Sequence, residues 1–103
     1  MNKLYIIVRN DLRPGLQLAQ SVHALAAFER AFPERYRAWV TGANNIVCLQ
    51  VPNEAALQTL LDLNDGEAVG FHEPDVGDQL TAIAVSDRGV QLAELPLALR
   101  RAA

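Results

Sequence analysis

The chain has 103 residues, half of them hydrophobic, and a formal net charge of −3. That length predicts one domain over residues 1–103 with one contiguous core, and the balance of charged and apolar residues excludes disordered and fibrous proteins. No stretch reaches the roughly 18 apolar residues that a membrane span needs, so we expect a cytoplasmic protein with no membrane partner.

Three short apolar runs, rich in β-branched residues and bounded by turn residues, predict strands. They cover residues 4–8, 46–51 and 80–85, and a weaker strand is predicted over residues 68–72. Because the runs are nearly continuous rather than alternating, we expect helices to cover both faces of the sheet.

The longest helix is predicted to follow the turn Arg13-Pro14-Gly15 and to end within residues 30–32. Helical spacing divides its side chains between two sides. The more apolar side, which we expect to pack on the sheet, carries Leu18, Val22, Leu25 and Phe28. The other side suits a ligand wall or a close contact with another helix, and it carries Gln20, His23, Ala24, Ala27 and Arg30.

Two further helices are predicted, one over residues 34–40 and one after the N-cap Asn53. The stripe expected to be buried on the second of these is Leu57, Leu60 and Leu61. A short helix is expected over residues 90–95, and the tail over residues 97–103 is expected to be loose. These elements predict an α/β fold with three layers, α/β/α, and a single mixed four-stranded sheet in the order β-α-α-β-α-β-β plus a short C-terminal helix.

Charge is divided unevenly along the chain. Residues 1–52 carry six basic and three acidic side chains, whereas residues 53–103 carry three basic and nine acidic ones. A polyanion would therefore have to bind the first half. The plain alternative is that the division reflects only the scatter of solvated surface charges.

Cys48 is the only cysteine and lies within an apolar run. One cysteine can form neither an intramolecular disulfide nor a cysteine-rich metal site. We expect Cys48 in the core and not as a catalytic thiol, because an activated cysteine needs an electropositive and partly exposed setting.

Common catalytic and nucleotide-binding motifs are missing: the phosphate-binding loop, the dinucleotide glycine fingerprint, the helical zinc motif and the nucleophile elbow. What is left is a set of polar residues near the predicted ends of elements, where ligands bind in open α/β sheets. These residues are Asn10, Asp11, Gln20, His23, His72, Glu73, Asp75, Asp78 and Thr81.

Several of these residues also have a purely structural interpretation. Asp11 follows a strand and could be a turn or cap residue rather than a ligand-binding one. His23 could act as a general base near neutral pH, or it could form hydrogen bonds across a packing surface. The three carboxylates within residues 73–78 could polarise a water molecule or bind a cation, or they could form a plain acidic turn.

In their order along the chain, these residues resemble the peptidyl-tRNA hydrolase type II family over residues 3–86. The resemblance rests on residues 8–12 (VRNDL), Gly15, residues 19–24 (AQSVHA), residues 75–77 (DVG) and residues 81–85 (TAIAV). Its most specific parts are the element Ala-Gln-x-x-His-Ala soon after the first strand and the aspartate-x-glycine before the last strand.

The resemblance implies a compact α/β/α protein, often dimeric, that cleaves the ester joining a peptide or an amino acid to tRNA. The candidate catalytic residues are Asp75, His23 and Thr81. The candidate substrate-binding residues are Gln20, Asp11, Asn10, Arg9, Arg13 and Gln79. We expect tRNA to bind the more basic first half, we expect a homodimer, and we assign no cofactor and no metal ligand.

The chain departs from the family pattern at the start of the long helix. The family has Leu-Lys-x-Gly-Lys-Gly-Lys there, whereas this chain is two residues shorter and has Leu16 where a lysine would stabilise the oxyanion. Either Arg9 or Arg13 would have to replace that lysine, or the fold would serve as a noncatalytic module that binds a small ligand or a protein. The family's arginine and threonine after the glycine are also replaced, by Asp78 and Gln79, which should weaken phosphate attraction.

Overall fold

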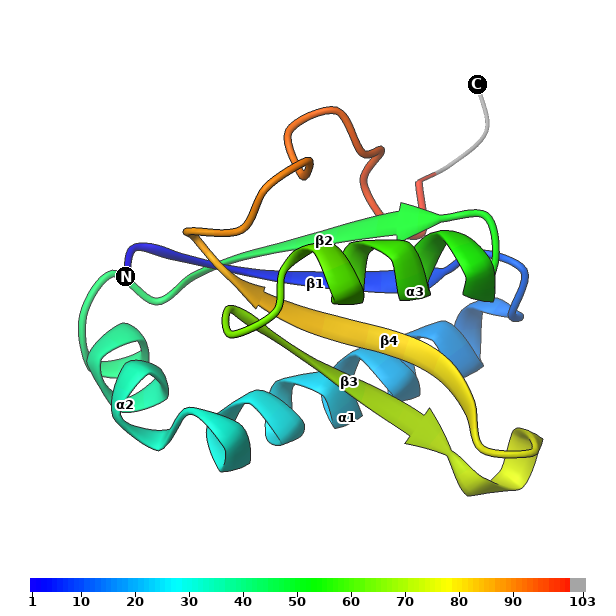
Figure 1. Cartoon of the computed structure of the whole chain (residues 1–103), viewed down its shortest axis with the longest axis horizontal. Coiled ribbons are helices and arrows are strands. Elements are labelled where there is room, and N and C mark those ends of the chain that lie inside the picture. The colour runs from blue at the N-terminus through cyan, green and yellow to red at the C-terminus, as the bar shows by residue number, and fades with distance from the viewer. Residues whose placement is uncertain (101–103) are drawn as a thin grey trace.

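The structure is a computed structural model, and it describes residues 1–100. Its elements in chain order are β1 (Lys3–Arg9), α1 (Pro14–Ala31), α2 (Pro33–Thr41), β2 (Asn45–Val51), α3 (Glu54–Leu63), β3 (Ala68–Glu73), the single 3₁₀ turn η1 (Pro74–Val76) and β4 (Gln79–Ser86). The predicted α/β class and the predicted order of helices and strands up to β4 are confirmed (Figure 1).

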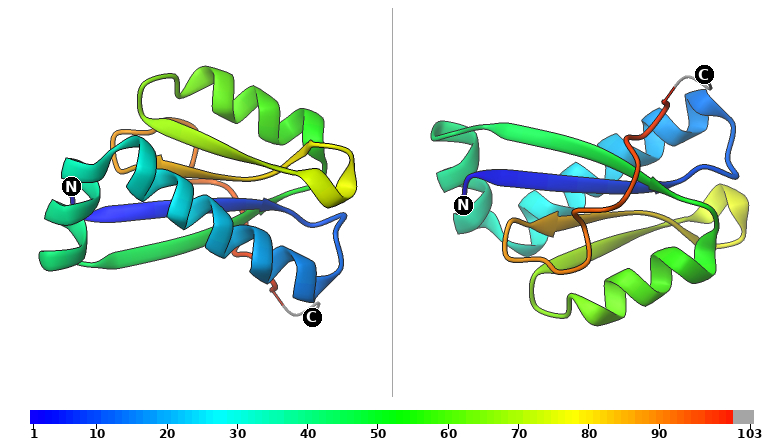
Figure 2. Two further views of the ribbon diagram at one scale, coloured as in Figure 1. Left: turned by 90° about the horizontal axis from the view of Figure 1, so that it is seen from below. Right: turned by 90° about the horizontal axis from the view of Figure 1, so that it is seen from above.

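The four strands form one mixed sheet in the order β2-β1-β4-β3. β1 pairs in parallel with β2, and β4 runs antiparallel to both β1 and β3. Helix α1 lies on one face of the sheet and helix α3 on the other (Figure 2). The predicted arrangement in three layers is therefore confirmed.

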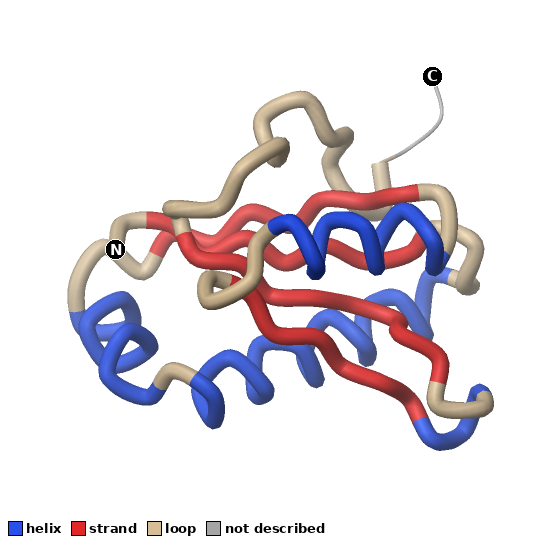
Figure 3. The backbone as a smooth tube through the Cα atoms, in the orientation of Figure 1, coloured by secondary structure: helices blue, strands red, loops and turns tan. Residues whose placement is uncertain are grey.

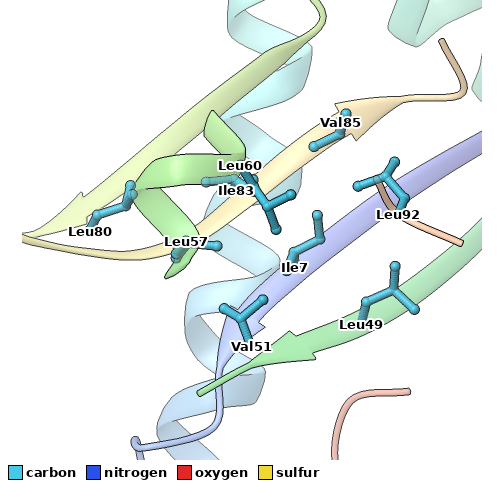
Figure 4. Close-up of a cluster of buried hydrophobic side chains, with 9 residues drawn as sticks. All are labelled: Ile7, Leu49, Val51, Leu57, Leu60, Leu80, Ile83, Val85 and Leu92. Carbon is cyan, nitrogen blue, oxygen red and sulfur yellow. The ribbon is translucent and has the colours of Figure 1, made fainter. Parts of the chain in front are cut away.

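Side chains from alternate strand residues build a hydrophobic cluster under α3 (Figure 4). Leu57 and Leu60 of α3 are buried in this cluster, and Leu61 packs against it while only partly buried. The side chain of Asn53 accepts a hydrogen bond from the Ala56 backbone N–H at 2.9 Å. The predicted N-cap is confirmed, and the predicted buried stripe is confirmed at two of its three positions.

Helix α1 packs on the sheet through a side that matches the predicted one only in part: Phe28 is buried as predicted, and Leu25 packs against the core while partly buried. The buried residues of α1 are Gln17, Gln20, Ala24 and Phe28, whereas Leu18 and Val22 are 60% and 59% exposed. The expectation that Leu18 and Val22 face the sheet was therefore wrong, as was the expectation that Gln20 and Ala24 face away from it. Burial of Gln20 is tolerated because its amide group finds hydrogen-bond partners on the sheet.

The face of β2 on the α1 side is largely uncovered. Ile46 is 46% exposed and Cys48 is exposed as well, because α1 lies over β4, β3 and β1. One prediction fails here, because Cys48 does not lie in the core. Helices do pack on both faces of the sheet, as predicted, but they leave β2 open on the α1 side. Partial desolvation by its neighbours raises the pKa of the Cys48 thiol, because loss of water disfavours the thiolate.

The segment after β4 forms turns rather than the predicted short helix over residues 90–95 (Figure 3). Asn64 Oδ1 accepts from the backbone N–H of Val90 at 2.7 Å, and Asn64 Nδ2 donates to the Val90 carbonyl at 3.4 Å. The second of these bonds uses the Val90 carbonyl, which a helix over residues 90–95 would need, and Leu92 is buried against the α3 cluster. A helix of so few residues is also costly to nucleate.

The beginning of the tail is bonded to β2 and is not loose as predicted. The Gln50 backbone N–H donates to the Pro96 carbonyl at 2.9 Å, and the Ala98 backbone N–H donates to the Cys48 carbonyl at 2.8 Å. This segment therefore extends the sheet by a short stretch at the edge of β2. The rest of the predicted loose tail includes residues 101–103, which lie outside the described residues.

Candidate functional site

Three loops lie at the same end of the sheet, where the parallel strands β1 and β2 end (Figure 1). They are residues 10–13 between β1 and α1, residues 52–53 between β2 and α3, and residues 74–78 between β3 and β4. In open α/β sheets, ligands bind at the carboxyl ends of parallel strands. Most of the predicted site residues lie on these loops or at the adjoining ends of the elements. We call this end of the sheet the candidate edge; it runs across the strands and is distinct from the outer edge of β2.

On the α3 side of the candidate edge, Arg9 is buried and bonded through all three guanidinium nitrogens. Its Nε and Nη2 donate to the two carboxylate oxygens of Asp11, each at 2.9 Å. Its Nη1 donates to Gln79 Oε1 at 2.8 Å and to the Leu80 carbonyl at 3.1 Å. Glu54 Oε2 accepts from the Leu80 backbone N–H at 2.7 Å, which ties α3 to the same point. The structure thus brings three predicted site residues together: Arg9, Asp11 and Gln79.

The ion pair shifts the pKa values of both partners. The hydrogen bonds from Arg9 lower the pKa of Asp11, with partial burial opposing and the positive charge of Arg9 adding to the effect. The same hydrogen bonds raise the pKa of Arg9. A guanidinium has five N–H groups, and the four bonds leave only one of them unused. Arg9 is therefore poorly suited to act as the oxyanion donor that a lysine provides in the family that the sequence resembles.

This pair predicts how stability depends on pH. The pKa of Asp11 is lower in the folded chain than its ordinary value of 3.8, so its contribution is complete above that pH and is lost as the pH falls through the lowered folded-state pKa. The Asp11 side chain is 40% exposed, so solvent screening keeps the contribution modest. Between about pH 5 and about pH 2, the wild-type chain should lose more thermal stability than Asp11→Asn.

Melting temperatures followed by circular dichroism across this pH range check the prediction. Asp65→Asn is the matched control, because it removes an exposed carboxylate at the opposite end of the sheet. The control should follow the wild-type curve. Parallel curves for the wild type and Asp11→Asn would mean that the pair adds nothing to stability.

On the α1 side of the candidate edge, a β-bulge turns Thr81 toward α1. The register between β3 and β4 shifts between Phe71 and His72, which leaves Thr81 as an extra residue in β4. Strict alternation would place Thr81 on the α3 face together with Ile83. Its hydroxyl instead donates to Gln20 Oε1 on α1 at 2.6 Å.

Gln20 connects Thr81 to a carboxylate at the end of β3. Gln20 and Thr81 are both 0% exposed. The Nε2 of Gln20 donates to Glu73 Oε1 at 3.0 Å, and Glu73 itself is partly buried. A hydrogen-bonded chain thus runs from Thr81 through Gln20 to Glu73, and we call these three residues the buried polar chain.

His23 packs on β3 from the helix α1. Its ring stacks on the Phe71 ring with 4.4 Å between centroids and 11° between planes, while the residue stays exposed. Within residues 1–100, its ring nitrogens have no hydrogen-bond partner. The stacking fits the packing alternative, and the role of His23 as a general base stays a prediction.

Three other predicted site residues lie at the rim of the candidate edge. Asp75 is exposed in η1, and Asn10 and Arg13 are exposed in the loop before α1. Among the described residues, none of these three side chains has a hydrogen-bond or ion-pair partner. Arg13 occupies the N-cap position of α1 without a side-chain cap bond, so its guanidinium can meet an anion from solvent.

Two residues of the candidate edge were not selected from the sequence as site residues. Gln17 is 5% exposed, its Nε2 donates to the Leu12 carbonyl at 2.5 Å, and its Oε1 has no partner in the described part of the chain. Glu54 is the first residue of α3, and its carboxylate bonds to the Leu80 backbone N–H. Gln17 lies three residues before Gln20 and so on the same side of α1, which is the signal that could have identified it.

Within residues 1–100, no group of three or more His, Cys, Asp or Glu side chains is placed to hold a metal ion. None of the described helices is long and apolar enough to cross a membrane. Two depressions lie away from the candidate edge: one of about 430 Å³ on α2, beside Glu34 and Arg37, and one of about 470 Å³ beside Gln91 and Leu95.

Comparison with known proteins adds no family assignment. No protein-family model matches the chain, and no curated protein matches it. The functional proposal therefore depends on the arrangement of residues at the candidate edge and on the order of motifs along the sequence.

Proposed function

We propose that the chain hydrolyses the ester between a peptide or an amino acid and tRNA. The observation that supports this most is the buried polar chain, which joins α1 to both strands of the β3–β4 hairpin at the candidate edge. Burial of polar side chains is unfavourable unless they are hydrogen bonded, so two fully buried ones imply a specified local geometry. Gln20 and Thr81 are also positions that the family resemblance retains.

Ester hydrolysis needs a base that activates water and positive potential that stabilises the oxyanion. Residues 73–78 supply carboxylates, among them Asp75, which the resemblance assigns to the active site. Positive potential would come from the amino-terminal end of α1, where the helix dipole is positive, and from the exposed Arg13. Arg9 is already paired and Leu16 has no donor, so catalysis should be slower than with a lysine at position 16.

The exposed basic side chains indicate how a tRNA would approach. Arg13, Arg30 and Arg37 are exposed along α1 and α2, whereas residues 73–78 carry three acidic side chains. A polyanion should therefore contact the α1–α2 layer and reach the candidate edge from that side. Self-association and a cytoplasmic location stay predictions.

A noncatalytic binding module is the second candidate function, and one observation favours it. The Arg9 guanidinium is hydrogen bonded to Asp11, Gln79 and Leu80. Leu16 stands at the position where the family has a lysine. A domain with that change would keep its fold and could still bind a ligand or a protein at the candidate edge. It would do so without cleaving an ester.

Restoring a lysine tests the two candidates against each other. Leu16 lies one helical turn before Gln20, roughly 6 Å along the axis and on the same side of α1. The wild-type chain should release labelled peptide from a peptidyl-tRNA mimic, and Leu16→Lys should raise the rate about tenfold or more. The reason is that a single oxyanion donor can contribute about 100-fold to 1000-fold to a rate.

Leu18→Lys is the matched control, because it adds the same charge to α1 at a position that is 60% exposed. This variant should change the rate by no more than about twofold. If neither the wild type nor Leu16→Lys releases peptide, the hydrolase proposal is wrong. Neither cleavage nor binding of tRNA by either protein would support the module that binds a small ligand or a protein.

A further inference from the structure

We infer that Glu73, rather than Asp75, is the general base of the ester hydrolysis; this inference rests on the function proposed above. The two carboxylates lie on the same turn but are held differently. Glu73 ends β3 and is partly buried, whereas Asp75 is exposed in η1. A general base works best when it is fixed relative to the substrate carbonyl, which favours the carboxylate that the protein holds in place.

Gln20 holds the side chain of Glu73 in one orientation. An ionised carboxylate only accepts hydrogen bonds, so Gln20 has to present its NH₂ group to Glu73, as it does at 3.0 Å. The Oε1 of Gln20 is then left for the Thr81 hydroxyl, which donates to it at 2.6 Å. Gln20 and Thr81 are both fully buried, so water does not compete for the bond between them, whereas the bond from Gln20 to Glu73 is partly buried. Gln20 and Thr81 are therefore positioning residues for Glu73.

The backbone of the turn fixes Glu73 as well. The Glu73 carbonyl accepts from the Asp78 backbone N–H at 2.9 Å. Gly77 and Asp78 close the turn with left-handed backbone angles, φ 69° and 58°, a conformation that aspartate tolerates better than most residues. The Oε1 of Glu73 is bonded to Gln20, while its Oε2 has no partner within residues 1–100 and can accept a proton from water.

The step balances in atoms and electrons. Glu73 takes a proton from a water molecule as the water oxygen bonds to the ester carbonyl carbon, and the carbonyl oxygen becomes an oxyanion. The tetrahedral intermediate then collapses and breaks the bond to the ribose oxygen, which takes the proton back from Glu73. The products are the carboxyl group of the peptide and the ribose hydroxyl of the tRNA, and the Glu73 carboxylate is regenerated.

Replacement of each carboxylate by its amide separates the two candidates. Glu73→Gln keeps an acceptor oxygen for Gln20 but removes the base. We expect it to lower kcat/KM for peptide release about 100-fold or more, and Asp75→Asn to lower it less than about tenfold. The wild type and Asp75→Asn should both lose rate at acidic pH as the base takes up a proton, and the residual rate of Glu73→Gln should lack this loss.

Asp65→Asn is the matched control, since Asp65 is exposed and lies at the opposite end of the sheet. It should keep the wild-type rate and pH profile. A large loss in Asp75→Asn with a small loss in Glu73→Gln would overturn the assignment to Glu73 and leave the hydrolase proposal intact. A Glu73→Gln variant that still loses rate at acidic pH would overturn the assignment in the same way.

Circular dichroism of Glu73→Gln shows whether the variant folds. If it does not, Asp75→Asn decides the question alone: a loss of about 100-fold overturns the inference, and a loss below about tenfold supports it. If the wild type and Leu16→Lys both release no peptide, the proposed function fails first, and the assignment of Glu73 fails with it.

Discussion

Replacing Phe28 with alanine is expected to lower the free energy of unfolding by about 3 to 5 kcal/mol. Phe28 is 0% exposed and packs from α1 onto a cluster that includes Leu4 and Ile6 of β1. The truncation removes buried apolar area and leaves a cavity that the strands cannot fill without moving. A domain of this size loses about 4 to 8 °C in melting temperature per kcal/mol, so thermal unfolding should show a drop of more than about 12 °C.

Leu18→Ala is the control for this experiment, because it truncates a large apolar side chain on the same helix. Leu18 is 60% exposed, so its truncation should lower the free energy of unfolding by less than about 1 kcal/mol. Equal losses for the two variants would mean that α1 faces the sheet through the side predicted from its apolar spacing. The observed orientation of the helix would then be wrong.

Replacing Arg9 with methionine is expected to lower the free energy of unfolding by about 2 to 4 kcal/mol. The change removes both bonds to Asp11, the bond to Gln79 and the bond to the Leu80 carbonyl. Without Arg9, the buried Leu80 carbonyl loses its guanidinium donor, which costs about 1 to 3 kcal/mol. Asp11 adds less, because it is 40% exposed and water can solvate it.

Urea denaturation of the Arg9→Met variant measures this loss as a shift of the midpoint at constant slope. Arg13→Met is the matched control, since Arg13 is exposed and has no ion-pair partner among the described residues. The control should change the free energy of unfolding by less than about 0.5 kcal/mol. Similar midpoints for Arg9→Met and the wild type would show that the network around Arg9 does not stabilise the fold.

The positions of the strands could be predicted because they depend on local spacing. Each predicted strand end lies within one residue of the observed one. Turn residues and the cap at Asn53 likewise act on their immediate neighbours, so the starts of α1 and α3 followed from a few adjacent residues. The layers then follow from the number and order of the elements.

The packing side of α1 could not be predicted in the same way. Apolar side chains occur around much of this helix, so their spacing does not define a single buried side; they are Leu16, Leu18, Val22, Leu25 and Phe28. The deciding contact is the bond between Gln20 and Thr81, which are 61 positions apart. Hydrophobic spacing cannot identify a buried glutamine, because its side chain is polar. Its hydrogen-bond partner lies far away in the sequence and can be identified only from the folded structure.

The candidate site was predicted in many of its residues but not in their connections. Thr81 reaches α1 only because of the bulge in β4, and a bulge depends on strand pairing rather than on periodicity. Arg9 was a candidate to bind substrate or to replace the family lysine, and its guanidinium is paired with Asp11. The catalytic roles that the resemblance implies for Asp75, His23 and Thr81 stay predictions, and we infer instead that Glu73 is the base and that Thr81 helps to position it.

Residues 96–98 cover part of the otherwise open outer edge of β2. An open edge strand offers unpaired N–H and C=O groups to strands of other molecules. A protein cut short before Pro96 would bare the Gln50 amide and the Cys48 carbonyl beside the already exposed Ile46. Such a truncated protein would tend to associate through this edge and precipitate. Residues 96–98 should therefore be kept when the protein is produced in a shortened form.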